Sequence, residues 1–284
     1  MNPRVFEEIK ETPMIEIIQS VEQHIDDKNE RKEEIEFLLD VLNIPYETQE
    51  YSTGKNLFAS LGKPPFIGIG SHYDVVPKTP GANDNGSAIA VTIDILRRAQ
   101  KEPLENIGIR GFFFDEEEVG LKGSRAYVKE KGIEDLIGLY NMELVGSGNK
   151  VALWSVNDIQ NTPLLKKLES KAREQKIEVY RIPMIVTNAA DHLSFKKGGL
   201  EDSFTLTTIT QEDLDVAPQY YAALQSRNPQ EEGWKVLTKA PVFRHYHQPT
   251  DKSENLSQQT LQMVSDLLWN SIKEIDKAYH KRGG

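Results

Sequence analysis

The sequence contains no cysteine, and this absence limits the cross-links and metal sites that the protein can form. Disulfides and thiolate ligands are excluded, so any bound metal must be held by histidine, aspartate or glutamate. Only six histidines occur in the 284 residues. A metal site with imidazole ligands must therefore use a small number of identifiable positions.

Long apolar runs are also missing. No stretch of about 18 apolar residues is present, which a membrane-spanning helix would need. The first residues, MNPRVFEEIKETPMIEII, have no apolar core of signal-peptide length, so we expect a cytoplasmic location and no membrane partner. The net charge of −10 argues against nucleic acid as a partner, because phosphate backbones attract basic surfaces. Nothing in the sequence indicates an oligomeric state.

Strand-like and helix-like segments alternate along the chain. This alternation predicts an α/β fold with a doubly wound, mostly parallel sheet and helices on both faces, organised as one domain over residues 1–284. Strands are expected at residues 45–51, 56–61, 66–71, 106–114, 136–142, 151–156, 177–182 and 203–208. Helices are expected at two places within 13–43, and at 86–99, 124–131, 162–175, 190–197, 211–224 and 256–279. Residues 226–244 show little periodicity and are predicted to form a long loop near a site.

Metal-competent side chains follow several of the predicted strands, and such strand ends form the sites of doubly wound sheets. They come from the segments GSHYDVVP, GANDNGSAIA, FFFDEEEVG, YNMELVG and FRHYHQPTD, and comprise His72, Asp84, the run 115–118, Glu143, His245 and His247. Imidazole and carboxylate ligands suit Zn²⁺, with Mn²⁺ and Co²⁺ as substitutes. Bound dications would also offset the repulsion among the four consecutive carboxylates of the run.

Each of these residues also has a purely structural interpretation. A histidine at a strand end is often a satisfied core residue, an acidic run is often a solvated loop, and Asp84 or Asn85 could simply cap the helix that follows. The metal-site interpretation is favoured because all of these residues fall at predicted strand ends, in glycine-rich turns.

Six segments resemble, in order, those of the co-catalytic dizinc aminopeptidases of the bacterial leucyl aminopeptidase type: GSHYDVVP, GANDNGSAIA, EEVGLKGS, NMELVG, DHLSF and YHQPTD. Glutaminyl cyclases and the catalytically inactive transferrin-receptor ectodomain belong to the same family. The segments span Gly70 to Asp251, and the GAxDN and EEVGLxGS forms are together the most specific. The HxDVVP form is shared with dizinc carboxypeptidases and deacylases, whose inserted dimerisation domain has little room in this chain.

The resemblance implies a single zinc-exopeptidase-like domain with two Zn²⁺ ions. His72 and Glu143 would bind one ion, Glu118 and His247 would bind the other, and Asp84 would bridge them. Family members usually have aspartate where this chain has Glu143, whose extra methylene could alter metal spacing or affinity.

The resemblance also implies residues that act beside the metals. Glu117 would be the general base that takes a proton from a water held between the ions. Asp74 would orient His72 through its other ring nitrogen. Asp191 and His192 would lie near the substrate, although Ala190 replaces the usual serine before them. Because successive side chains at a strand end point in opposite directions, the base and the neighbouring ligand could have different functions.

One ligand has a competitor in the sequence. His245 lies two residues from His247, but the His-x-Pro-x-Asp frame favours His247. The pocket would be built from loops around 188–195 and 226–246, with aromatic residues that could equally belong to the core: Tyr220, Tyr221, Trp234 and Phe243. A carboxylate near the metals would bind a free amino terminus, and the candidates are Asp115, Glu116 and Asp191.

We therefore expect a zinc-dependent exopeptidase, most readily an aminopeptidase that removes N-terminal residues from peptides. The alternatives on the same fold are a glutaminyl cyclase-like acyltransferase, a carboxypeptidase, and an amidase acting on a small amide. A non-catalytic binding module is the remaining alternative, although all five ligand positions hold metal-competent residues.

Overall fold

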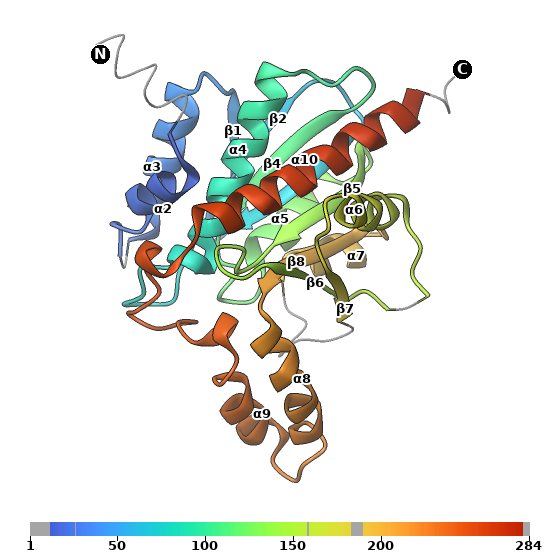
Figure 1. The fold of residues 1–284 in the computed structure, drawn as a ribbon. Helices are drawn as coiled ribbons and strands as arrows, with labels where there is room; N and C mark the ends of the chain where they lie inside the picture. Colours follow the sequence, from blue (N-terminus) through green and yellow to red (C-terminus); the bar gives the residue numbers. More distant parts are fainter. Residues whose placement is uncertain (1–11, 26, 158, 183–189, 281–284) are drawn as a thin grey trace.

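The computed structural model describes residues 12–25, 27–157, 159–182 and 190–280, which form one eight-stranded sheet with helices on both faces (Figure 1). The strands lie in the order β1 (Tyr46–Glu50), β2 (Lys55–Leu61), β4 (Gly108–Phe114), β3 (Phe66–His72), β5 (Leu136–Met142), β8 (Ser203–Ile209), β6 (Lys150–Trp154) and β7 (Val179–Ile182). The four central strands β4, β3, β5 and β8 run parallel, whereas β1, β2 and β6 make the antiparallel pairs. The predicted α/β fold is confirmed.

The central strands are buried on both faces, which explains why β3 and β4 are apolar along most of their length. Every residue of β3 is buried. The three phenylalanines of β4 divide between two cores: Phe113 faces one, and Phe112 and Phe114 face the other. The apolar run before the acidic residues is therefore a strand covered on both faces.

Two helical layers cover these faces. The first contains α2 (Met14–Val21), α3 (Lys28–Val41), α4 (Ser87–Lys101), α6 (Pro163–Glu174) and α10 (Gln258–His280), whose apolar residues share the larger core. The second contains α5 (Lys122–Lys131) and α7 (His192–Lys197), which pack against each other beneath the phenylalanines. None of the helices in the described part of the chain is long and apolar enough to cross a membrane.

The region from 226 to 244 differs from the prediction of a long loop. It contains α9 (Pro229–Leu237) and a 3₁₀ turn (Pro241–Phe243), and α9 forms a hairpin with α8 (Gln211–Ala223) that projects from the sheet (Figure 1). The hairpin packs around its own small core, so only a short apolar stripe is needed on α9. A nine-residue helix that contains a glycine gives too weak a periodic signal to be recognised.

Candidate metal centre

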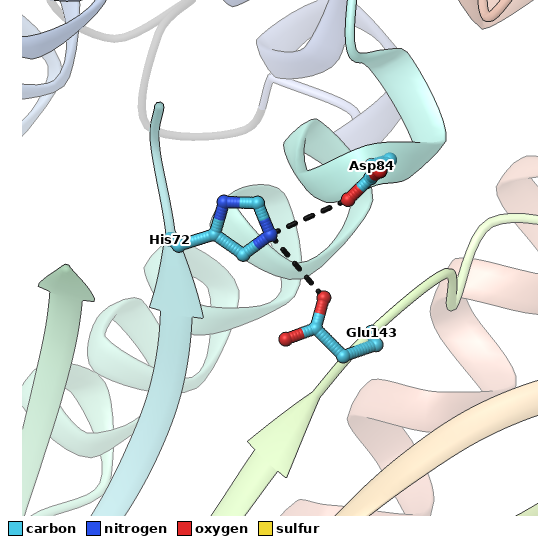
Figure 2. A group of neighbouring side chains, drawn as sticks. All are labelled: His72, Asp84 and Glu143. Atoms are coloured by element: carbon cyan, nitrogen blue, oxygen red, sulfur yellow. Dashed lines mark ion pairs between the residues drawn. The ribbon is translucent and has the colours of Figure 1, made fainter. Parts of the chain in front are cut away.

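Three predicted ligands meet where the strand ends face the turn before α4. His72 is the last residue of β3, Glu143 follows β5, and Asp84 lies in the turn Ala82–Gly86. The Nε2 atom of His72 lies 3.3 Å from Asp84 Oδ1 and 3.3 Å from Glu143 Oε2, and all three side chains are buried (Figure 2). Neither Asp84 nor Asn85 caps α4, because the N-cap position is occupied by Gly86 and no side chain forms a capping hydrogen bond there.

A second group shares Asp84 with the first. The other oxygen of this carboxylate, Oδ2, lies 3.3 Å from His247 Nε2, and the same nitrogen lies 3.1 Å from Glu118 Oε2. Asp84 thus faces a different histidine with each oxygen, which is the arrangement of a bridging carboxylate. The structure brings together all five residues that the sequence suggested as ligands.

Asp74 connects the strand end of His72 to the acidic turn. Its carboxylate accepts hydrogen bonds from the main-chain N–H groups of Glu117 and Glu118, at 3.0 and 3.1 Å. The Nδ1 atom of His72 lies 3.1 Å from the Asp74 carbonyl and 3.3 Å from its carboxylate. Because a carbonyl can only accept, Nδ1 carries a proton, and Nε2 is the ring nitrogen that faces Asp84 and Glu143.

The acidic run divides into two pairs. Glu117 and Glu118 both face the centre, since their oxygens and a nitrogen of His72 lie within 4.8 Å of one another. The expectation that they point in opposite directions is wrong. β4 ends at Phe114, and the positive φ of Glu116 (57°) replaces the strand alternation by a turn.

Asp115 and Glu116 face away from the centre and have lysine partners. Lys28 Nζ lies 3.0 Å from Asp115 and 3.6 Å from Glu116, and Lys122 Nζ lies 3.7 Å from Glu116. The main-chain N–H of Lys55 also donates to Asp115, at 3.1 Å. Neither carboxylate belongs to the clusters that could hold a metal ion.

The pKa values of the inner groups indicate a surplus of negative charge. Burial raises the pKa of Glu118 to about 7, and nearby Asp84 adds to this effect. Burial also raises the pKa of Glu117 well above its ordinary value. Burial alone would lower the pKa of His247, but hydrogen bonds to Asp84 and Glu118 raise it to about 9. Without a metal, these groups would hold protons in place of a cation.

Two asparagines orient Glu143, and sequence reasoning missed both. Asn85 Nδ2 donates to Glu143 Oε2 at 2.8 Å, and Asn141 Nδ2 donates to Oε1 at 3.3 Å. The hydroxyl of Thr207 donates to the Glu143 carbonyl at 2.7 Å. The longer glutamate side chain is therefore held at both oxygens. Asn85 follows Asp84 directly in the GAxDN segment, which was the available signal.

Asp191 and His192 lie at the start of α7 and are fully buried. Among the described residues, neither carboxylate oxygen of Asp191 has a hydrogen-bond partner, and burial raises the pKa of this carboxyl to about 8. His192 Nδ1 lies 2.6 Å from Thr205 Oγ1, which also accepts from Asn141 Nδ2 at 3.1 Å. Burial lowers the pKa of His192 to about 3, so its ring is neutral. His192 is thus linked through the Thr205 side chain to the Asn141 amide that orients Glu143. The role of Asp191 and His192 near the substrate stays a prediction.

The two competing histidines, His245 and His247, lie in the segment before α10 but have different surroundings. His245 Nδ1 lies 2.9 Å from Thr250 Oγ1, and His245 is absent from the metal-competent clusters. Tyr246, which sequence reasoning missed, stacks on His247 with ring centroids 3.7 Å apart. Burial and the surrounding carboxylates raise the pKa of Tyr246, so its phenol stays protonated. Its position immediately before His247 was the only sequence signal.

An apolar cavity of about 60 Å³ lies between the α8–α9 hairpin and the sheet. Two of its lining residues contact residues at the centre: the Thr207 hydroxyl donates to the Glu143 carbonyl, and the Phe243 ring packs edge-on against Tyr246 with centroids 5.6 Å apart. Three of the four predicted aromatic residues line it: Tyr220, Tyr221 and Phe243. Trp234 is 45% exposed on α9 and is absent from the lining. Residues 188 and 189 of the predicted pocket lie outside the described residues.

The donor atoms fit zinc. Two imidazole nitrogens and the carboxylate oxygens form overlapping groups whose ligand atoms lie within 4.8 Å of one another. His247 Nε2 is buried and faces one oxygen of Asp84 at 3.3 Å and one of Glu118 at 3.1 Å. A cation between these atoms would bind both the imidazole nitrogen and the carboxylate oxygens.

The chain belongs to peptidase family M28, whose sequence model matches residues 56–272. Aminopeptidase YwaD of Bacillus subtilis is 28% identical over 222 residues, which cover 77% of this chain and 43% of YwaD. This chain therefore spans less than half the length of that relative.

Solved structures share the fold. BSAP, a zinc aminopeptidase from Bacillus subtilis, superposes with a TM-score of 0.61 at 24% identity, over 78% of this chain and 50% of that one. Glutaminyl cyclase of Porphyromonas gingivalis superposes with a TM-score of 0.67 at 14% identity, over 92% and 97% of the two chains. At these identities, the similarity supports the α/β fold and leaves the choice of reaction to the site itself.

Proposed function

We propose that this protein is a zinc-dependent aminopeptidase with two Zn²⁺ ions. The observation that carries the proposal is Asp84, whose two oxygens face the two histidines of separate ligand groups. His72 and Glu143 would hold one ion, and Glu118 and His247 the other. The family membership and the zinc aminopeptidase fold support the same assignment. Residues 1–284 forming a single domain and the cytoplasmic location stay predictions.

Bound zinc would polarise the carbonyl of the scissile peptide and lower the pKa of a water molecule at the centre. Glu117 would take the proton of that water and pass it to the leaving amine. Its half-buried carboxyl has a raised pKa in the metal-free protein, because desolvation and the neighbouring carboxylates favour its protonated form. Asp74 holds the main-chain N–H of Glu117 and so keeps the base beside His72.

The free amino terminus of the substrate needs an anionic partner. Of the three carboxylates considered, Asp115 and Glu116 are paired with Lys28. Asp191 has no hydrogen-bond partner within the described residues and lies near the charges of His72 and Glu143. We therefore assign Asp191 to the substrate ammonium group. The apolar cavity beside Tyr246 would receive the side chain of the N-terminal residue.

A pool of short peptides tests the proposal. The pool is incubated with the zinc-loaded protein, with Glu117→Gln, and with His245→Gln, which changes a neighbouring histidine outside the clusters. Products are identified by mass. We expect loss of single N-terminal residues, preferably apolar ones, with wild type and His245→Gln but not with Glu117→Gln.

The other outcomes contradict the proposal in distinct ways. Loss of C-terminal residues would indicate a carboxypeptidase, and loss of ammonia from N-terminal glutamine would indicate a cyclase. Unchanged peptides with two bound zinc ions would indicate a non-peptide amide substrate. Unchanged peptides without bound zinc would indicate a binding module.

A further inference from the structure

Arg31 is a buried cation that binds main-chain carbonyls behind the metal centre. It lies on α3 and is fully buried. Its guanidinium donates to the carbonyls of four residues: Nε to Tyr73 at 2.8 Å, Nη1 to Pro80 at 2.9 Å and to Val21 at 3.1 Å, and Nη2 to Gly81 at 3.4 Å. All four acceptors are uncharged. A buried guanidinium with such partners is unusual enough to need an explanation beyond charge pairing.

The carbonyls that Arg31 binds lie at both ends of one segment. Tyr73 directly follows His72, whereas Pro80 and Gly81 directly precede the turn that contains Asp84. The planar guanidinium of Arg31 therefore joins the two ends of the loop that connects His72, a proposed ligand of one ion, to Asp84, the proposed bridging ligand.

The turn after this loop has a tight geometry. Gly81 has a φ of +62°, and its carbonyl also accepts from the main-chain N–H of Gly86 at 3.0 Å. The fourth acceptor, Val21, is the last residue of α2, so the guanidinium is also anchored to the helical layer. The position of Asp84 relative to His72 thus depends on a group that touches neither side chain.

A carboxylate holds the opposite side of the same turn. Asp251 accepts hydrogen bonds from the main-chain N–H groups of Asn83 at 2.8 Å and Asp84 at 3.0 Å. Arg31 and Asp251 therefore bind the turn from its carbonyl side and its amide side. Burial lowers the pKa of Arg31 to about 10, which still leaves it charged at neutral pH.

We propose that Arg31 is a positioning residue of the metal centre, which fixes the separation of His72 and Asp84 by binding the carbonyls of Tyr73, Pro80 and Gly81. The inference rests on the proposed zinc centre. Lysine could not replace arginine here, because its single ammonium group cannot reach both ends of the loop as the guanidinium fork does.

The test compares Arg31→Lys with a matched variant far from the site. Asp276 on α10 is also buried and also holds main chain, since it accepts from the N–H groups of Glu105, Asn106 and Ile107 before β4. That segment precedes the N-terminal end of β4, whereas the acidic turn follows its C-terminal end. Asp276→Ala is therefore the control for lost stability alone, and Arg31→Met is a second variant that also removes the charge.

Three quantities are measured on the folded proteins: Zn²⁺ affinity against a chromophoric chelator, the visible absorption of the Co²⁺-loaded protein, and the thermal midpoint of the metal-free protein. We expect Arg31→Lys to lower Zn²⁺ affinity about 10- to 100-fold, as loss of groups that orient metal ligands does. The Co²⁺ absorption should change, and kcat should fall more than KM rises. Asp276→Ala should lower the thermal midpoint and leave metal affinity and absorption unchanged.

Wild-type Zn²⁺ affinity and Co²⁺ absorption in Arg31→Lys would overturn the inference while leaving the zinc centre intact. Equal losses of metal affinity in Arg31→Lys and Asp276→Ala would also overturn it, because the effect would then be one of general stability. If the wild-type protein binds neither metal, the proposed function fails and the inference fails with it. Arg31→Lys decides the question even if Arg31→Met does not fold.

Discussion

The acidic run contains two pairs of carboxylates with opposite surroundings. The outer pair, Asp115 and Glu116, lies against the lysines Lys28 and Lys122. The inner pair, Glu117 and Glu118, faces His72, His247 and further carboxylates. A single turn thus divides four adjacent acidic residues into a pair with lysine partners and a pair that forms no ion pair with lysine or arginine among the described residues.

The pKa directions show what this difference means. In the outer pair, burial raises the pKa of Asp115 in spite of the hydrogen bond from Lys28, whereas the hydroxyl of Thr53 and the charge of Lys28 lower the pKa of Glu116 below its ordinary value. Burial and Asp84 raise the pKa of Glu118 to about 7, since only titratable histidines oppose them. A buried anionic group without a permanent counter-charge either binds protons or binds a cation. The inner pair therefore indicates a metal centre, whereas the outer pair indicates a structural ion-pair network.

Replacing the inner base should have the largest effect. Glu117→Gln keeps the shape and the main-chain hydrogen bond to Asp74 but cannot take a proton. We expect kcat to fall at least about 100-fold with zinc content unchanged. Steady-state kinetics and elemental analysis measure the two quantities. Glu116→Gln is the matched control in the outer pair and should keep near wild-type kcat; turnover near wild type in Glu117→Gln would remove Glu117 from the role of base.

Replacing the inner ligand should weaken zinc binding. Glu118→Gln removes the anion that faces His247 Nε2 at 3.1 Å. We expect the affinity for one of two zinc ions to fall at least about 10-fold, because a lost ligand should cost no less than a lost orienting group. Titration against a competing chelator resolves the two binding events. Two tightly bound zinc ions in the variant would show that Glu118 is not a ligand.

The metal-free protein should lose stability as pH rises. The pKa of Glu118 rises from 4.5 to about 7 on folding, and that of His247 rises from 6.5 to about 9. The folded protein thus holds protons that the unfolded chain releases, so its unfolding free energy falls between about pH 4.5 and about pH 9. Zinc competes with these protons, so the rise in thermal midpoint on adding zinc should grow over the same range.

Thermal midpoints with chelator and with zinc, measured across that pH range, test this expectation. In metal-free Glu118→Gln, the thermal midpoint should fall less steeply in the acidic part of that pH range, because one of the titrating groups has been removed. A midpoint of the metal-free wild type that rises steadily with pH would contradict the assignment of these protons to the inner groups.

Removing the cation of the outer pair should affect stability alone. Lys28→Met leaves Asp115, whose side chain is 2% exposed, without its ammonium partner. We expect a loss of about 1–3 kcal/mol, below that for a fully buried ion pair because the Lys28 side chain is 36% exposed. Denaturant unfolding measures the loss, and zinc affinity should stay at the wild-type value. A weakened zinc site in Lys28→Met would show that the two pairs are coupled.

The control for this variant is the more exposed lysine of the same network. Lys122 lies 3.7 Å from Glu116 with a side chain that is 45% exposed. Lys122→Ala should therefore cost only about 0–1 kcal/mol.

Local patterns in the sequence were enough to locate most of the fold and the ligand set. β5 was predicted at 136–142 and lies at Leu136–Met142, because a buried central strand is apolar along most of its length. Strand ends suggested His72, Glu118 and Glu143 among the candidates, since the carboxyl ends of adjacent parallel strands meet at one edge of a sheet. The resemblance to the dizinc aminopeptidases selected the full set, including Asp84 and His247, which the structure places in turns. Cysteine's absence and the order of the six segments restricted the metal chemistry further.

The tertiary structure alone decided which carboxylates face the centre and what holds them there. The turn at Glu116 gives Glu117 and Glu118 the same direction, which strand periodicity could not predict. Lys28 and Arg31 both come from α3, yet one neutralises the outer pair and the other holds the loop between His72 and Asp84. Such contacts join residues that are 42 to 87 positions apart, so they depend on how helices pack on the sheet and leave no periodic signal in the sequence.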